Sequence, residues 1–272
     1  MPMNPCPALP ALLLAAAAVT ANAQTSPAIR SLDASRAESP IRVDGLLTEG
    51  SWAAAQWTDD FGDIRGEAWP TPTWRTRAKL LWDDEYLYVG AALEEPHLWG
   101  TLTERDAIIY RDHDFEVFLD PDGDGLEYFE LEINALGTEF DLFLDKPYSA
   151  GGKAHIQWDM PGLLTAVRLD GTLNDPSDVD RGWSVEIAIP WTDLRPPGAP
   201  PGRAVRVGDE WRVNFSRVQW PLEVVGDGYE KAAVPTDERQ HPEDNWVWSP
   251  QGVINMHVPE MWGVVRFVGG RE

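Results

Sequence analysis

The stretch from 112 to 141, DHDFEVFLDPDGDGLEYFELEINALGTEFD, constrains the fold of this chain more than any other segment. It contains two runs of alternating apolar and polar residues joined by an acidic turn, and alternate side chains of a strand point to opposite faces. One face carries Phe115, Val117 and Leu119 followed by Phe129, Leu131 and Ile133, and the other carries Glu116, Phe118 and Asp120 followed by Tyr128, Glu130, Glu132 and Asn134. The stretch therefore predicts a hairpin with one face on an apolar core. Its other face offers carboxylates, an amide and aromatic rings, which suit the hydroxyls and C–H groups of a sugar.

Further strands are predicted along the rest of the chain. The segment 77–93 reads as two strands joined by Asp83-Asp84-Glu85, a hairpin signal. Other predicted strands cover 139–145, 165–169, 182–190, 210–219 and 262–268, and short helical turns are predicted at 46–56 and 190–194. Many strands with few helical segments indicate an all-β sandwich.

The N-terminal segment has the pattern of a secretory signal. The first 29 residues contain no acidic or basic residue, and the apolar run 9–19, too short to cross a bilayer, precedes Ala21-Asn22-Ala23. We expect a signal peptide at 1–23, cleaved before Gln24, a polar tail or linker at 24–40, a folded domain at 41–272, and a secreted or periplasmic protein. The positive charge that usually begins such signals is missing, so an uncleaved anchor is the alternative. Cys6, the single cysteine, lies in the removed segment, so the mature protein would fold without disulfides.

Charge and motifs exclude several function classes. A formal net charge of −23 argues against nucleic acid, because phosphates would be repelled. The sequence contains no H-E-x-x-H, no G-x-S-x-G and no phosphate-binding glycine loop, and no stretch after residue 23 is long and apolar enough to span a membrane. We expect a monomer that is not an enzyme, and the 14 tryptophans, all after residue 23, suit a sugar binder that keeps some rings exposed.

Three passages in order resemble the family 9 carbohydrate-binding modules and their relatives. They are LLWDDEYLYVGAALEEP (80–96), the hairpin at 112–141 and GWSVEIAIPWTDL (182–194), and the likeness extends to WGVVRF at 262–267. The resemblance implies a jelly-roll antiparallel β-sandwich of the type shared with DOMON domains. It also implies non-catalytic binding of an oligo- or polysaccharide in polysaccharide use.

The resemblance also implies which residues hold the sugar. In sugar-binding members two aromatic rings clamp a terminal sugar ring and a strand carboxylate binds its hydroxyls. These positions fall here on Tyr110 and Glu116, with the second aromatic in Asp244-Asn245-Trp246 and with Trp248 nearby. Tyrosine replaces the first tryptophan of the modules, and Glu132 stands where they have an arginine, so the resemblance supports sugar binding but does not carry over their reducing-end specificity.

Four residues of the expected site also have an interpretation that involves no sugar. Glu130 and Asn134 lie on the face of Glu116 and would flank the sugar, or belong to a solvated strand face. Trp246 and Trp248, in a polar loop flanked by prolines, would stack on the sugar or close the end of the sandwich.

A metal site is predicted in the acidic turn. Asp120, Asp122 and Asp124 have the alternate spacing that lets oxygen ligands converge on calcium, and relatives commonly carry structural calcium. No glutamate closes a twelve-residue loop, so an acidic turn without metal is the alternative, and no cofactor is required.

Two other functions remain open at this stage. Relatives of this fold bind haem through methionine, histidine or lysine, and Met256, His257 and Met261 lie close together, although no ligand for the opposite side of the iron is evident. A glycoside hydrolase needs two suitably spaced carboxylates, which so acidic a chain could supply by accident.

Overall fold

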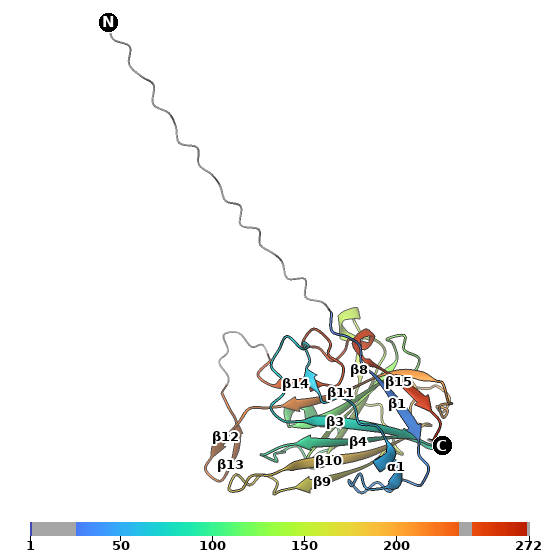
Figure 1. Cartoon of the computed structure of the whole chain (residues 1–272), viewed down its shortest axis with the longest axis horizontal. Coiled ribbons are helices and arrows are strands. Elements are labelled where there is room, and N and C mark those ends of the chain that lie inside the picture. The colour runs from blue at the N-terminus through green and yellow to red at the C-terminus, as the bar shows by residue number, and fades with distance from the viewer. Residues whose placement is uncertain (2–25, 234–240, 271–272) are drawn as a thin grey trace.

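The computed structural model describes residue 1, residues 26–233 and residues 241–270 (Figure 1). The described residues form fifteen strands, one short helix, α1 (Gly50–Ala54), and three 3-10 turns, η1 (Ile109–Arg111), η2 (Tyr148–Ala150) and η3 (Pro259–Met261). The strands are β1 (Ser31–Arg36), β2 (Gly62–Asp63), β3 (Thr76–Trp82), β4 (Tyr86–Glu94), β5 (Asp114–Asp120), β6 (Tyr128–Asn134), β7 (Glu139–Leu144), β8 (Ala154–His155), β9 (Leu164–Asp170), β10 (Gly182–Pro190), β11 (Glu210–Gln219), β12 (Leu222–Val225), β13 (Gly228–Lys231), β14 (Asp244–Val247) and β15 (Gly263–Val268).

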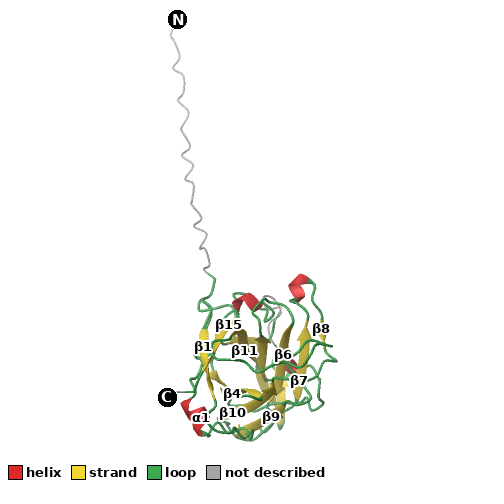
Figure 2. Cartoon of the chain, turned by 90° about the vertical axis from the view of Figure 1, so that its right-hand side faces the viewer, coloured by secondary structure: helices red, strands yellow, loops and turns green. Residues whose placement is uncertain are grey.

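The strands form a β-sandwich, which confirms the predicted fold class. Pairing runs in the order β8-β7-β6-β5-β11-β15-β1-β3-β4-β10-β9, while β14 pairs with β11 and β2, and β12 and β13 form a separate ribbon. The sheet turns at β15 and β1, so β3, β4, β10 and β9 lie side by side in one layer and β5 to β8 with β11 form the other (Figures 1 and 2). The main core contains side chains from both layers and lies between them.

The hairpin predicted from the alternation at 112–141 is present. β5 and β6 pair antiparallel with Glu116 opposite Glu132 and Val117 opposite Leu131. Phe115, Val117 and Leu119 enter the main core, as predicted. The opposite face is also buried, because Glu116 and Glu132 are only 4% and 2% exposed. The interpretation of this face as a solvated strand surface is therefore wrong.

The segment predicted to be a tail at 24–40 contains a strand. β1 pairs in parallel with β15 and with β3, so the sandwich is not wholly antiparallel. Leu32 and Ala34 are 4% and 0% exposed. Local pattern gave a weak signal for this strand because only Leu32 and Ala34 point inward and its main partner lies at the other end of the chain.

The remaining predicted strands appear close to their expected bounds, whereas the helical turn predicted at 190–194 is a hydrogen-bonded turn without a helix. β3 and β4 form the expected hairpin, and α1 carries Trp52, which is fully buried and donates from Nε1 to Glu186 Oε1 at 2.6 Å. The predicted signal peptide and its cleavage site before Gln24 lie outside the described residues. Among the helices that the structure describes, none combines the length and apolarity needed to cross a membrane.

Candidate functional site

A cavity of about 610 Å³ lies over the polar face of the β5/β6 hairpin. Its floor includes Glu116, Glu130 and Glu132, and Phe118, Phe140 and Leu142 add apolar surface. The remaining lining residues come from the segments around η1, η2, β8, β11, β14 and the loop 254–257, and are Asp106, Ile108, Tyr110, Tyr148, Ala154, Ile156, Val218, His241, Glu243, Asn245, Ile254, Asn255, Met256 and His257.

The floor of the cavity is acidic and desolvated. Burial raises the pKa of the Glu116 carboxyl to about 7, and burial with the neighbouring charge of Glu116 raises the pKa of Glu130 and Glu132 well above the usual range. Carboxyl groups in this state can donate or accept hydrogen bonds, which matches the mixed character of sugar hydroxyls. Glu132, which stands where the family has an arginine, lines the cavity, and no arginine is among the described lining residues.

Two tyrosines and two isoleucines form an apolar rim around this acidic floor. Tyr110 and Tyr148 are 43% and 48% exposed, and Ile108 and Ile156 are also exposed. The backbone of Tyr110 is fixed on both sides, because its N–H donates to Glu132 Oε2 at 2.8 Å and its carbonyl accepts from Trp220 Nε1 at 2.9 Å. Its ring is therefore free for contact with a ligand. Exposed apolar rings around a polar floor are a typical ligand-binding arrangement.

Tyr148 was not predicted from the sequence. It lies in η2, in a segment without alternation, and only the tertiary structure brings it over the cavity. Its ring meets the edge of His257 with centroids 4.5 Å apart. A tyrosine in a turn beside Pro147 and Ser149 gives little signal by itself, although exposed aromatics in turns are candidates for ligand contact.

His257 supports the cavity wall as a neutral side chain. Burial lowers the pKa of its imidazole to about 4. Nδ1 lies 3.0 Å from the Tyr128 hydroxyl, and Nε2 lies 4.0 Å from Glu130 Oε2. Met256 also lines the cavity, whereas Met261 does not, so the predicted haem cluster is only partly brought together. The acidic floor opposite is unlike the deep apolar pocket that haem requires.

Three predicted site residues near the C-terminus do not share one face: the side chain of Asn245 lines the cavity, and those of Trp246 and Trp248 lie in the core. The segment is strand β14 and not the expected loop, with Trp246 opposite Arg217 on β11 and Asp63 on β2. Asn245 faces the cavity, while Trp246 is 5% exposed in the main core. Trp248 is 1% exposed and packs on Phe215. The expected stacking role of these two tryptophans is therefore wrong, because their rings support the core.

Asn134 has a local structural role. It is fully buried, its Nδ2 donates to the Leu102 carbonyl and to Asp112 Oδ2, and its Oδ1 accepts from the N–H groups of Leu136 and Thr138. Its side chain holds the turn after β6 and does not line the cavity, so the expected contact with a sugar is not supported.

The acidic turn brings its three aspartates together. One carboxylate oxygen from each of Asp120, Asp122 and Asp124 lies within 4.8 Å of the others. Asp120 is buried and accepts the N–H groups of Gly123 and Gly125 at 3.0 and 2.9 Å, while Asp122 and Asp124 are exposed. The two amide bonds already satisfy Asp120, so this turn can form without an ion. Whether calcium binds there stays a prediction.

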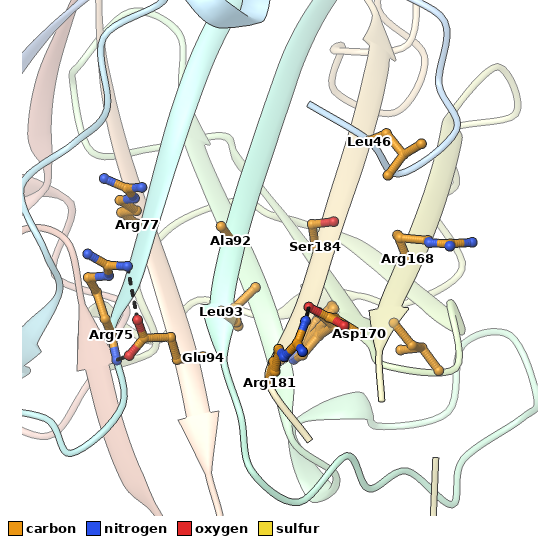
Figure 3. A pocket seen from close by; sticks show the side chains of 13 residues that line it. Leu46, Arg75, Arg77, Ala92, Leu93, Glu94, Arg168, Asp170, Arg181 and Ser184 are labelled. Carbon is orange, nitrogen blue, oxygen red and sulfur yellow. Dashed lines mark hydrogen bonds and ion pairs between the residues drawn. The ribbon is translucent and has the colours of Figure 1, made fainter. Parts of the chain in front are cut away.

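A second hollow, of about 430 Å³, lies on the outer face of the other layer and has a different chemistry (Figure 3). Arg77, Ala92, Ser184 and Arg168 follow one another across β3, β4, β10 and β9, so small side chains separate two arginines. Next to them Arg75 pairs with Glu94 at 2.9 Å, and Arg181 pairs with Asp170 at 3.5 Å; both pairs also line this hollow. The aromatic residue in its lining, Trp183, is only 4% exposed. This hollow therefore lacks the exposed rings that border the first cavity.

Two curated enzymes contain a segment similar to part of this chain. It is 29% identical over 117 residues to exoglucanase XynX of Acetivibrio thermocellus, which is 43% of this chain and 9% of the enzyme. It is also 29% identical over 118 residues to endo-1,4-beta-xylanase A of Thermoanaerobacterium saccharolyticum, 43% of this chain and 8% of that enzyme. The matched part thus spans less than a tenth of each relative.

Solved structures share the fold. A family 9 carbohydrate-binding module from Caldicellulosiruptor kristjanssonii, determined with cellotriose, superposes with a TM-score of 0.56 at 17% identity, covering 89% of this chain and 95% of that one. A putative carbohydrate-binding protein from Bacteroides uniformis gives a TM-score of 0.63 at 14% identity, covering 88% and 100%. Residues 43–214, more than half of the chain, match the family model "Carbohydrate family 9 binding domain-like". The chain belongs to the carbohydrate family 9 binding domain-like family.

Proposed function

We propose that this chain is an exported, non-catalytic carbohydrate-binding protein that holds a sugar in the cavity over β5 and β6. The observation that carries the proposal is the pair of half-exposed rings, Tyr110 and Tyr148, at the rim of a buried acidic floor. Aromatic carbon desolvates the apolar face of a pyranose while buried carboxyl groups bind its hydroxyls.

Cello-oligosaccharides are the first ligand class to examine. The Caldicellulosiruptor kristjanssonii module of the same fold was determined with cellotriose and with glucose. In this chain Tyr148 takes the part that the sequence assigned to Trp246, because it is exposed at the cavity whereas Trp246 is buried. Glu116 and Asn245 remain as polar contacts, since both line the cavity.

Calorimetric titration with glucose, cellobiose, cellotriose and the matching xylo- and manno-oligosaccharides tests the proposal. The variant is Tyr110→Ala, whose anchoring hydrogen bonds are both made by the backbone and survive the change. The exposed 43% of a tyrosine corresponds to roughly 90 Å², which at about 25 cal/mol per Å² is worth at most about 2 kcal/mol, or about thirtyfold in affinity.

Arg168→Ala is the matched control, because it removes an exposed side chain from the second hollow and leaves the first cavity intact. We expect Tyr110→Ala to weaken sugar binding and Arg168→Ala to leave it unchanged. The reverse result would move the sugar to the second hollow. Absence of heat with every sugar, or release of new reducing ends during incubation, would contradict non-catalytic sugar binding.

A further inference from the structure

The cavity floor continues into a buried carboxylate cluster. Asp114, Glu116 and Glu132 each place a carboxylate oxygen within 4.8 Å of the other two. They are 0%, 4% and 2% exposed, and Glu130 at 5% adds a fourth buried acid. Carboxylates desolvated at this spacing repel one another strongly, so they require either protons or a bound cation.

Two oxygens of the cluster have no hydrogen-bond partner among the described residues. Asp114 Oδ1 accepts the N–H of Val218 at 3.0 Å, but Asp114 Oδ2 and Glu116 Oε2 are buried without a hydrogen bond among the described residues. Leaving such an atom unpaired is expensive. Glu132 is already partnered, because its Oε2 accepts the N–H of Tyr110 at 2.8 Å and its side chain shares a hydrogen bond with Glu130. The free oxygens point to a missing positively charged partner.

Few basic side chains lie near this cluster in the described part of the chain. The cavity is lined by no lysine or arginine within the described part of the chain, and burial keeps His257 neutral. Arg217 on β11 attracts the Asp114 carboxylate, but its hydrogen bonds go elsewhere, since Nη2 donates to Glu95 at 2.8 Å and to Gln219 at 2.7 Å. Its charge is thus matched by Glu95.

The spacing fits one hard cation. Calcium binds oxygen ligands at about 2.4 Å, so two ligand oxygens on one ion lie at most about 4.8 Å apart. The donors are all oxygen atoms, with no histidine or cysteine in the group, which favours calcium over transition metals.

We propose that Asp114, Glu116 and Glu132 bind a calcium ion at the floor of the cavity. Glu116 and Glu132 line the cavity and Asp114 does not, so an ion held by the three would lie at the edge of the cavity. Water or sugar hydroxyls complete the coordination. The ion site rests on the protein residues alone, and its contact with sugar rests on the proposed function.

The test starts from full-length mature protein stripped of metal with a chelator and titrated with calcium chloride. We expect one binding heat and a higher melting temperature, because a ligand that binds only the folded state stabilises it. Asp114→Asn should weaken calcium binding at least tenfold. In chelator it should melt at or above the temperature of the unmodified protein, because it removes a buried charge. Glu132→Gln serves as the second variant should Asp114→Asn fail to fold.

Asp122→Asn is the control, since it removes an exposed carboxylate from the acidic turn and leaves the cluster intact. It should bind calcium like the unmodified protein. Equal melting curves in calcium and chelator would overturn the proposal, and so would loss of binding in Asp122→Asn with binding kept in Asp114→Asn. The two proposals fail separately, because sugar binding in chelator without any calcium binding would leave only the proposed function standing.

Discussion

Replacing Trp246 with alanine tests whether this ring packs in the core, as in the structure, or stacks on a sugar, as the sequence resemblance led us to expect. The sequence alone places this ring in an exposed loop as a sugar clamp. In the structure the ring is 5% exposed in the core, and the Arg217 guanidinium lies 5.0 Å from its centroid. The structure therefore predicts that Trp246→Ala damages stability and not the sugar contact.

The magnitude follows from the burial. A tryptophan side chain buries roughly 200 Å² or more, and about 25 cal/mol per Å² gives about 5 kcal/mol as an upper estimate. Measured losses for such truncations are about 3–5 kcal/mol, and the fully buried Arg217 loses a cation–π contact as well. We expect the free energy of unfolding to fall by about 4 kcal/mol. Tyr110→Ala, which removes a half-exposed ring, should cost less than about 1 kcal/mol.

Urea unfolding followed by circular dichroism measures this loss, and sugar titration at low temperature measures binding by the folded fraction. Trp246→Phe keeps an aromatic ring and serves as the milder variant should the alanine variant not fold. A loss of stability below about 1 kcal/mol together with abolished sugar binding would refute the burial argument and restore Trp246 as a clamp.

Two further predictions concern pH and processing. The pKa of His257 is about 4 in the folded chain against about 6.5 when unfolded, so below pH 6.5 the unfolded state binds more protons and His257 removes stability as pH falls towards 4, by up to about 3 kcal/mol. Unfolding curves of His257→Gln between pH 4 and 7 should lack this part of the slope, and an identical slope would contradict the assignment. Mass spectrometry of the exported protein should give a mature chain beginning at or near Gln24, and a chain with Met1 intact in a membrane fraction would contradict the signal peptide.

Much of the fold could be predicted from local pattern. Alternation with period two is imposed by the backbone of any strand, so it identified β5, β6, β10 and β11 and the core face of the hairpin. The same pattern identified Glu116 as a residue of the opposite face. These features depend on neighbours within a few residues along the chain.

The site depended on contacts between distant segments. Alternation shows that a strand has two faces, but it does not show what covers each face. Only the loops carrying Tyr110, Tyr148 and His257 turn the polar face into a cavity and bury its carboxylates. Their packing changes Glu116 from a solvated acid into one with a pKa of about 7.

The position of Trp246 also depends on strand pairing between distant segments. Once residues 244–247 pair with β11 and β2, alternation sends Asn245 to the cavity and Trp246 to the core. The sequence by itself determined the sandwich and the polar face of its central hairpin. The tertiary structure decided which rings border the cavity and which acids are buried, because both depend on pairing and burial between segments far apart in the chain.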